Sequence, residues 1–197
     1  MLVRTSDILR PGETRAWTWF DEISIPAAAA PTDYFFFRDR VGKDDTQTNM
    51  QADGRMPSGY VFRTIAVELV PQRGTVLAGP VVPLAGAVFN VVSASYAQFW
   101  VGSAEMLNVD FTEANCASGY YGSIAVGGSA GAFTSINAIQ NGYPAAVGVQ
   151  AMDPSIRLTE NEAFRVELHF PTAPVTGLGV ALPVKCFLFG MLHRPYQ

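Results

Sequence analysis

The segment from Phe164 to Phe170 alternates apolar and polar residues, and this pattern constrains the fold more than any other part of the chain. Successive side chains of a β-strand point to opposite faces of the sheet. The alternation therefore assigns two faces, an apolar one with Phe164, Val166, Leu168 and Phe170 and a polar one with Arg165, Glu167 and His169. A similar phrase runs from Phe62 to Pro71. The two segments predict related strands of a β-sandwich rather than parts of an α/β enzyme.

Further short segments have the character of strands and are bounded by Gly, Pro or polar turn residues. They lie at Trp17–Trp19, Ile23–Ile25, Tyr34–Phe37, Val88–Val92, Tyr96–Val101, Met106–Phe111, Tyr120–Val126 and Val184–Leu192. Both faces of the last segment are apolar, which predicts a central strand. We therefore predict an all-β fold, a single jelly-roll β-sandwich or barrel over residues 1–197, in which residues 1–31 form an extended N-terminal arm or edge segment.

The segment Ala132–Gln140 is the best helical candidate, because Phe133, Ile136 and Ile139 recur at every third position. The dipeptide Asn141–Gly142 that follows would end a helix, but it also favours the tight turn of a β-hairpin. The sequence leaves helix and strand open for 132–140.

Charged residues make up 15% of the chain, well below the usual fraction of about a quarter. Two long runs carry no charge at all, Thr75–Ala104 and Ala114–Met152. They fit buried hairpins or the charge-poor centres of subunit contacts. A transmembrane helix over Thr75–Ala104 is a third interpretation, but Gly, Pro and polar residues interrupt that run.

The net charge of −4 argues against nucleic acid as a direct partner. Arg4, Arg10 and Arg15 are too sparse to form a basic arm. The segment Met1–Arg15 lacks the apolar core of a signal peptide. Cys116 and Cys186 have no Cys-X-X-Cys spacing, so buried free thiols are the expectation and a single disulfide is the alternative.

The strongest enzymatic signal is Gly127–Gly128–Ser129–Ala130–Gly131, which matches the G-x-S-x-G nucleophile elbow of serine hydrolases. Asp153 and His169 follow Ser129 in the order that such a triad requires. However, the sequence shows no series of βα units, and His169 belongs to an alternating strand. Gly and Ser are also common in any tight loop. We therefore expect a glycine-rich loop and no catalytic site.

Metal and cofactor sites are not expected either. His169 and His193 are far apart in sequence, and Cys186 is too far from His193 along one strand to share an ion with it. The polar stretch Asp39–Asp53 lacks the spacing of an EF-hand, so a solvated loop is favoured over a calcium site. The aromatic residues Trp17, Trp19 and Phe20 are expected in the core, or as anchors in a neighbouring subunit if the N-terminal segment is exchanged.

Two parts of the chain resemble a known family. The residues Thr48–Asn49–Met50, Gly54 and Met56–Pro57–Ser58–Gly59 before the strand at Phe62, together with Asn161–Pro171, are similar to the jelly-roll major capsid proteins of tailless icosahedral bacteriophages. The similarity covers about residues 34–70 and 156–193. It implies a β-barrel subunit that assembles into a closed shell, often around an internal membrane, with no need for a basic arm.

We therefore expect a structural virion protein, a coat subunit that is assembled in the host cytoplasm and is not an enzyme. Its expected partners are copies of itself and other capsid proteins, with an internal membrane beneath the shell as a further candidate. Contacts are expected in residues 1–31 and 114–152. The alternatives are a serine hydrolase that uses Ser129, Asp153 and His169, and a jelly-roll carbohydrate- or ligand-binding module with a pocket near Tyr120 and Tyr121.

Overall fold

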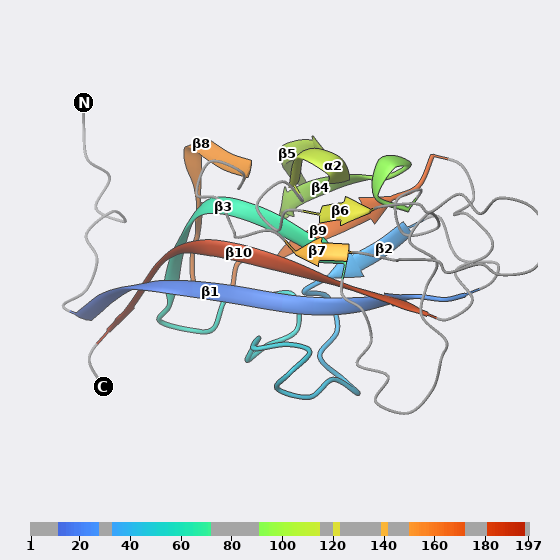
Figure 1. Cartoon of the computed structure of the whole chain (residues 1–197). Helices are drawn as coiled ribbons and strands as arrows, with labels where there is room; N and C mark the ends of the chain where they lie inside the picture. The colour runs from blue at the N-terminus through green and yellow to red at the C-terminus, as the bar shows by residue number, and fades with distance from the viewer. Residues whose placement is uncertain are drawn as a thin grey trace, which may run out of the picture.

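The computed structural model describes residues 12–27, 33–71, 91–114, 120–122, 139–141, 150–171 and 181–195. These residues form a β-sandwich of two four-stranded antiparallel sheets (Figure 1). The prediction of an all-β fold is therefore confirmed. Helical structure in the described residues is limited to short segments, 91–93 and α2 (Phe111–Ala114).

The two sheets differ in strand length. Sheet A has the order β1 (Gly12–Ile25), β10 (Leu182–Pro195), β3 (Val61–Pro71) and β8 (Gln150–Leu158). Sheet B has the order β2 (Asp33–Phe36), β9 (Phe164–His169), β4 (Tyr96–Val101) and β5 (Ala104–Asp110). Except for the β4–β5 hairpin, consecutive strands of the sandwich alternate between the two sheets.

One hydrophobic core fills the space between the sheets, because each strand directs alternate side chains inward. Trp19, Phe62 and Leu188 enter it from sheet A, and Phe99 and Leu168 from sheet B. The apolar face predicted for 164–170 is buried throughout, and Phe62 of the related segment is buried as well. The central packing thus follows directly from the alternation in the sequence.

Strand β10 is central in sheet A, as its two apolar faces predicted. Its ladder with β3 shifts register between Phe189 and Gly190. A Cβ atom on Gly190 would lie 2.1 Å from the Arg63 carbonyl oxygen and 2.7 Å from Cζ of Phe62. At this irregularity the backbones of β3 and β10 lie so close together that only glycine fits at position 190.

Other predicted elements differ from the structure in their extent. The two short strands at Trp17–Trp19 and Ile23–Ile25 are one strand of 14 residues, β1. The predicted strand Val88–Val92 is wrong at its end, since 91–93 is helical. Strand β8 was not predicted, because Asp153–Pro154 interrupts its pattern.

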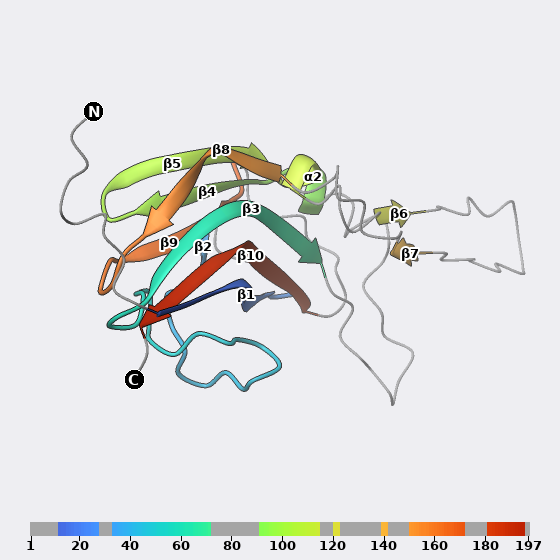
Figure 2. The same ribbon diagram turned by 90° about the vertical axis from the view of Figure 1, so that its left-hand side faces the viewer.

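A small third sheet pairs β6 (Tyr120–Gly122) with β7 (Ile139–Asn141), and Figure 2 shows it lying away from the sandwich, beyond α2. In the candidate helix 132–140, residues 139 and 140 are strand and the others lie outside the described residues. Also outside them are residues 1–11 and 28–31, most of the charge-free runs, Ser129 with its glycines, and Cys116. No helix in the described part of the chain is long and apolar enough to cross a membrane.

Candidate functional site: the outer faces of the sandwich

The outer face of sheet B carries polar and aromatic side chains in registered rows, and we call it the polar-aromatic face. Its rows across β2, β9, β4 and β5 are Asp33, His169, Tyr96 and Asp110, then Phe35, Glu167, Gln98 and Asn108, then Arg165, Trp100 and Glu105. Four carboxylates of this face lie near two guanidinium groups, that of Arg165 and that of Arg38, whose guanidinium carbon lies 4.9 Å from the centroid of the Phe35 ring. The polar side chains that the sequence assigned to one face of β9, Arg165, Glu167 and His169, lie at the centre of this face.

His169 lies between two carboxylates on this face. Its Nδ1 is 2.5 Å from Oδ1 of Asp33 on β2, and its Nε2 is 3.0 Å from Oε2 of Glu167. The ring of Tyr96 stacks on the imidazole with centroids 5.2 Å apart. Because β2 has only four residues, the contact with Asp33 ties a short edge strand to its neighbour β9.

This arrangement bears on the predicted Ser129–Asp153–His169 triad. Ser129 lies outside the described residues, and only the backbone of Asp153 is described, so the triad stays a prediction. A general base needs one ring nitrogen directed at the nucleophile. Both ring nitrogens of His169 already contact carboxylates, an arrangement that does not favour this role.

Arg165 links the remaining residues of the polar-aromatic face. Its Nε donates to Oε1 of Glu167, and its Nη1 donates to the carbonyl oxygen of Gly102 at 3.2 Å. The guanidinium carbon lies 5.1 Å from the centroid of the Trp100 ring, within the range of a cation–π contact. Polar contacts and ring stacking thus make this face an ordered surface.

The outer face of sheet A has a different character, and we call it the apolar-basic face. Phe187 and Phe189 of β10 stack with ring centroids 6.2 Å apart, and Phe20 of β1 lies 6.1 Å from Phe187. Beside them, Met191 is 39% exposed and Ile65 is 46% exposed. An apolar patch with a polar rim is typical of an interaction surface.

Three cationic side chains of the described residues lie at the rim of the apolar-basic face, those of Arg63, Arg157 and Lys185. Arg63 of β3 and Arg157 of β8 occupy directly opposite positions, and both side chains are exposed. The Nζ of Lys185 lies 3.6 Å from Oε2 of Glu22 and 5.3 Å from the centroid of the Phe20 ring.

Glu68 is a carboxylate that lies among the apolar side chains of this face. It is opposite Phe187 on β10 and only 7% exposed. Burial raises the pKa of Glu68, because the ionised carboxylate loses its hydration there. The acid is therefore held in a setting that favours its neutral form.

The edge of β1 is covered by the loop between β2 and β3, which runs along this strand in Figure 1. Oδ1 of Asn49 accepts a hydrogen bond from the Phe20 N–H at 2.7 Å, and Nδ2 of Asn49 donates to the Thr18 carbonyl at 2.7 Å. The Asn49 N–H also donates to the Phe20 carbonyl at 3.2 Å. A loop residue thus bonds the groups that a further strand would use.

Asp21 fixes the same loop from inside the sandwich. Its carboxylate accepts from Lys43 Nζ at 2.8 and 2.7 Å and from the Phe37 N–H at 2.6 Å. Burial raises the pKa of Asp21, although Lys43 and the Phe37 N–H oppose this shift. The contact also stabilises Phe37 at φ +64°, a left-handed conformation that is rare for a bulky residue.

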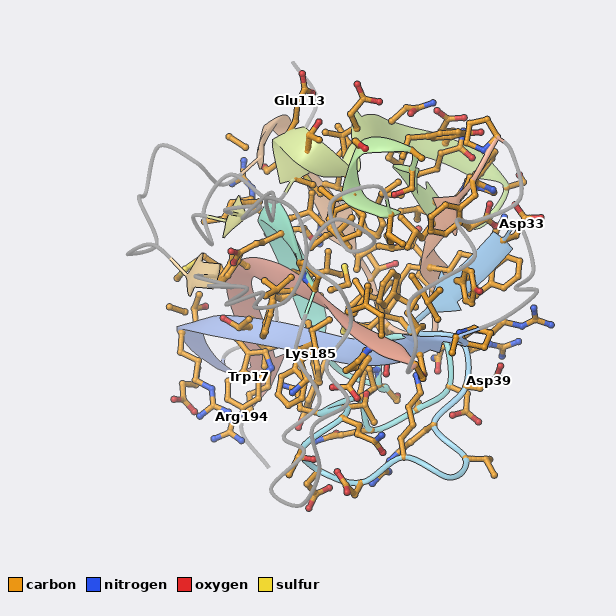
Figure 3. All side chains as sticks on the ribbon, turned by 45° about the vertical axis from the view of Figure 1, so that its right-hand side comes forward. Trp17, Asp33, Asp39, Glu113, Lys185 and Arg194 are labelled. Carbon is orange, nitrogen blue, oxygen red and sulfur yellow. The ribbon has the colours of Figure 1, made fainter. Side chains whose placement is uncertain are left out.

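An open groove of about 370 Å³ lies between β1, β2 and this loop. It is lined by Glu22, Asp33, Tyr34, Asp39 and Lys43, among others. Asp33 and Asp39 lie on the same side of the molecule, far from Glu113 of α2 (Figure 3). Lys43 is engaged by Asp21, so the groove is acidic, but no group of three or more potential metal ligands occurs in the described residues.

Acidic residues of the Asp39–Asp53 loop stabilise the loop itself. Oδ1 of Asp44 accepts from the N–H and the hydroxyl of Thr46 at 2.8 and 2.5 Å, and Oδ1 of Asp53 accepts from the Arg40 N–H at 2.8 Å. These bonds lie within the loop, and the choice between a solvated loop and a calcium site stays a prediction. Cys186 is a buried free cysteine, and burial raises its thiol pKa well above the usual value. It is the buried apolar residue that was predicted.

Several residues of these surfaces were not identified from the sequence. Asp21, Asp33 and Asn49 act through contacts between distant segments, which no local pattern shows. Phe20 was grouped with Trp17 and Trp19, but the structure places it on the opposite face of β1. Strict alternation within β1 is the signal that separates it from the two tryptophans.

Neither a protein-family model nor a curated protein matches this chain.

Proposed function

We propose that the sandwich is a single jelly roll. The supporting observation is nested antiparallel pairing, in which the first strand pairs with the last: β1 with β10, β2 with β9, β3 with β8 and β4 with β5. Such nesting is what results when one long antiparallel hairpin folds over on itself into two sheets. Jelly rolls of this kind form viral coat domains, lectin domains and cupins.

We further propose that the chain is a structural virion protein, a coat subunit that assembles into an icosahedral shell. The observation that carries this proposal is the apolar-basic face, where Phe20 of β1 and Phe187 and Phe189 of β10 lie on the outer side of sheet A, with Met191 and Ile65 exposed. A small protein that buries so complete a core has no need of apolar groups on an outer face unless a partner covers them. Repeated copies of the same chain are the simplest partner.

The proposed partners are copies of the chain, other capsid proteins and, beneath the shell, an internal membrane. The proposed location is the virion, after assembly in the host cytoplasm. Direct binding of nucleic acid is not part of the proposal, since the net charge is −4.

Negative-stain electron microscopy of the purified full chain tests the coat proposal. Closed shells or regular capsomers of uniform size are expected, first alone and then with lysate of the cognate virus as a source of partner proteins. A protein that remains dispersed in both conditions contradicts the proposal.

A second candidate is a ligand-binding module, and the polar-aromatic face favours it. Tyr96 and Trp100 lie on one strand face beside carboxylates and amides, as in surfaces that bind sugars through stacking and hydrogen bonds. A glycan array with the parent and with Tyr96→Ala distinguishes the two functions. Saturable binding that Tyr96→Ala abolishes, without particle formation, would favour the binding module.

A further inference from the structure

His169 lies where the short edge strand β2 meets the rest of sheet B, and it contacts carboxylates from two strands. Its Nδ1 is 2.5 Å from Oδ1 of Asp33 on β2, and its Nε2 is 3.0 Å from Oε2 of Glu167 on β9. Asp33 and His169 are also directly opposite each other in the ladder of β2 with β9. We call these three side chains the histidine bridge.

The histidine bridge needs a protonated imidazole when both carboxylates are ionised. A neutral imidazole has one N–H donor, and its other ring nitrogen is an acceptor, whereas the imidazolium donates from both nitrogens. An ionised carboxylate is an acceptor only. Only the imidazolium can therefore donate to Asp33 and Glu167 at once. Without the proton, one of the two carboxylates faces a lone pair.

The charged and titratable groups around the histidine bridge come from every strand of sheet B. Arg165 donates to Oε1 of Glu167, so this carboxylate has a second cation beside it. The ring of Tyr96 stacks on the imidazole at 5.2 Å. In the described part of the chain, the groups on this side of the sheet are Asp33 on β2, Arg165 and Glu167 on β9, Tyr96 on β4, Asp110 opposite Tyr96 on β5, and the Arg38–Asp39 pair that follows β2 beyond Phe37.

The two carboxylates of the bridge differ in how firmly they are held. The Glu167 side chain is 10% exposed and keeps its contact with Arg165, while the Asp33 side chain is 49% exposed. When the imidazole loses its proton, Asp33 can turn toward water at little cost, and Glu167 cannot. The contact that depends on the proton is therefore the one between His169 and Asp33, which joins two strands.

The short length of β2 makes this contact important for the strand. β2 has four residues, and Tyr34 and Phe36 bury their side chains in the core. These two rings hold the strand against the sandwich, but Asp33 at its first position points to the outer face. Loss of the bridge therefore loosens the beginning of β2 and leaves the buried rings in place.

We propose that the histidine bridge is a pH-dependent fastening of the edge strand β2. Histidine is the side chain whose charge ordinarily changes between pH 5 and 8. The imidazolium fastens Asp33 to β9 at the acidic end of this range, and loss of its proton releases the beginning of β2 at the alkaline end. Asp33 also lines the groove between β1, β2 and the loop that follows, so the release alters one wall of that groove. The inference is independent of the proposed coat function.

The second histidine of the chain provides a comparison. Nδ1 of His193 is 2.9 Å from the Thr14 hydroxyl oxygen, on the other sheet. A hydroxyl both donates and accepts, so this contact persists whether the ring nitrogen carries a proton or not. We therefore expect no pH-dependent release at the contact between β1 and β10.

Hydrogen–deuterium exchange of the full chain at about pH 5.5 and pH 8, read by mass spectrometry, tests the proposal. Exchange rates are corrected for the intrinsic effect of pH, so that protection factors are compared. Protection of the β2 amides is expected to fall about fivefold from pH 5.5 to pH 8, the effect of losing one hydrogen bond. The amides of β5, the other edge strand of sheet B, serve as the internal reference and should change less than about twofold.

Two variants of the bridge and one control identify its source. In Asp33→Asn the amide can donate to a neutral imidazole as well as accept from a protonated one, so the pH dependence of β2 protection should disappear. His169→Gln removes the titrating group and should give the same protection at both pH values. His193→Gln is the matched control and should keep the fivefold change of the parent. Because the Asp33 side chain is half exposed, Asp33→Asn carries the test even if His169→Gln fails to fold.

The outcomes decide the proposal without reference to assembly. A parent whose β2 protection is the same at both pH values overturns it, as does a change that β5 shares to the same extent. The proposal is likewise overturned if Asp33→Asn keeps the fivefold change or if His193→Gln abolishes it. A change confined to β2, lost in Asp33→Asn and kept in His193→Gln, supports it.

Discussion

The packing of β10 against β3 leaves no room for a side chain at Gly190. A Cβ atom there would lie 2.1 Å from the Arg63 carbonyl oxygen, a distance that real structures do not show. The surrounding strands are central, so the backbone of β3 cannot move away without disturbing the core.

Gly190→Ala is therefore expected to destabilise the protein by at least about 2 kcal/mol. Urea unfolding followed by tryptophan fluorescence measures this change. Met191→Ala is the matched control on the same strand, and because its side chain is partly exposed its cost should stay below about 1 kcal/mol. Equal midpoints for the two variants would show that β3 and β10 are not so closely packed.

The raised pKa of Glu68 predicts that the stability of the fold depends on pH. Its pKa is raised by burial, so the folded state binds this proton more tightly than the unfolded state. The corresponding stability is fully present below the unfolded pKa and is lost as the pH rises through the folded pKa. Glu68→Gln, which mimics the neutral acid, should be more stable than the parent at pH 7, and the difference should vanish below about pH 4.

Glu13 should change the stability of the fold with pH in the opposite direction. The hydrogen bond from Arg194 and the attraction of its charge lower the pKa of Glu13. Its contribution to stability is therefore present above the unfolded pKa and is lost as the pH falls through the folded pKa. In thermal melts between pH 3 and 8, Glu13→Gln should be less stable than the parent at pH 7. A Glu13→Gln variant that is more stable than the parent at pH 7 would contradict the assignment for Glu13.

At the level of the strands, the edge of β1 is covered by the loop between β2 and β3 instead of by a further strand. Asn49 bonds the backbone of Thr18 and Phe20 with both ends of its amide. Asn49→Ala removes both side-chain bonds and leaves backbone groups of β1 open, so a loss of about 1–3 kcal/mol is expected. Hydrogen exchange of the Phe20 amide should accelerate in this variant. Asn108→Ala on the exposed face of β5 is the control, and unchanged exchange at Phe20 in both variants would exclude the protective role of Asn49.

The sequence predicted elements well where a strand contains its own pattern. Strands β9 and β10 follow from alternation and from two apolar faces, and β4 was predicted with its observed ends. The sequence predicted two strands where the structure has β1, because Phe20, Asp21 and Glu22 interrupt the alternation of apolar and polar residues. Asp21 nevertheless points into the sandwich, where its carboxylate pairs with Lys43. Such compensation by a distant residue cannot be read from a local window.

The outer faces could be predicted only in part. Arg165, Glu167 and His169 were assigned to one face from alternation alone, and this is confirmed. Their partners could not be predicted, because Asp33 reaches His169 only through the register of β2 with β9. Opposite positions of Arg63 and Arg157 likewise depend on the register of β3 with β8.

At the scale of the whole molecule, a well-filled core coexists with an apolar outer face. The core takes large side chains from both sheets, so the fold does not need Phe20, Phe187 and Phe189 outside it. Their placement is understandable if the folded subunit is an intermediate and the assembled shell is the final state.

Sedimentation velocity of the full chain over a wide concentration range tests this account most directly. We expect the 21.2 kDa chain to convert, as its concentration rises, to a large species of defined size. A single species of monomer mass at every concentration would contradict the proposed assembly.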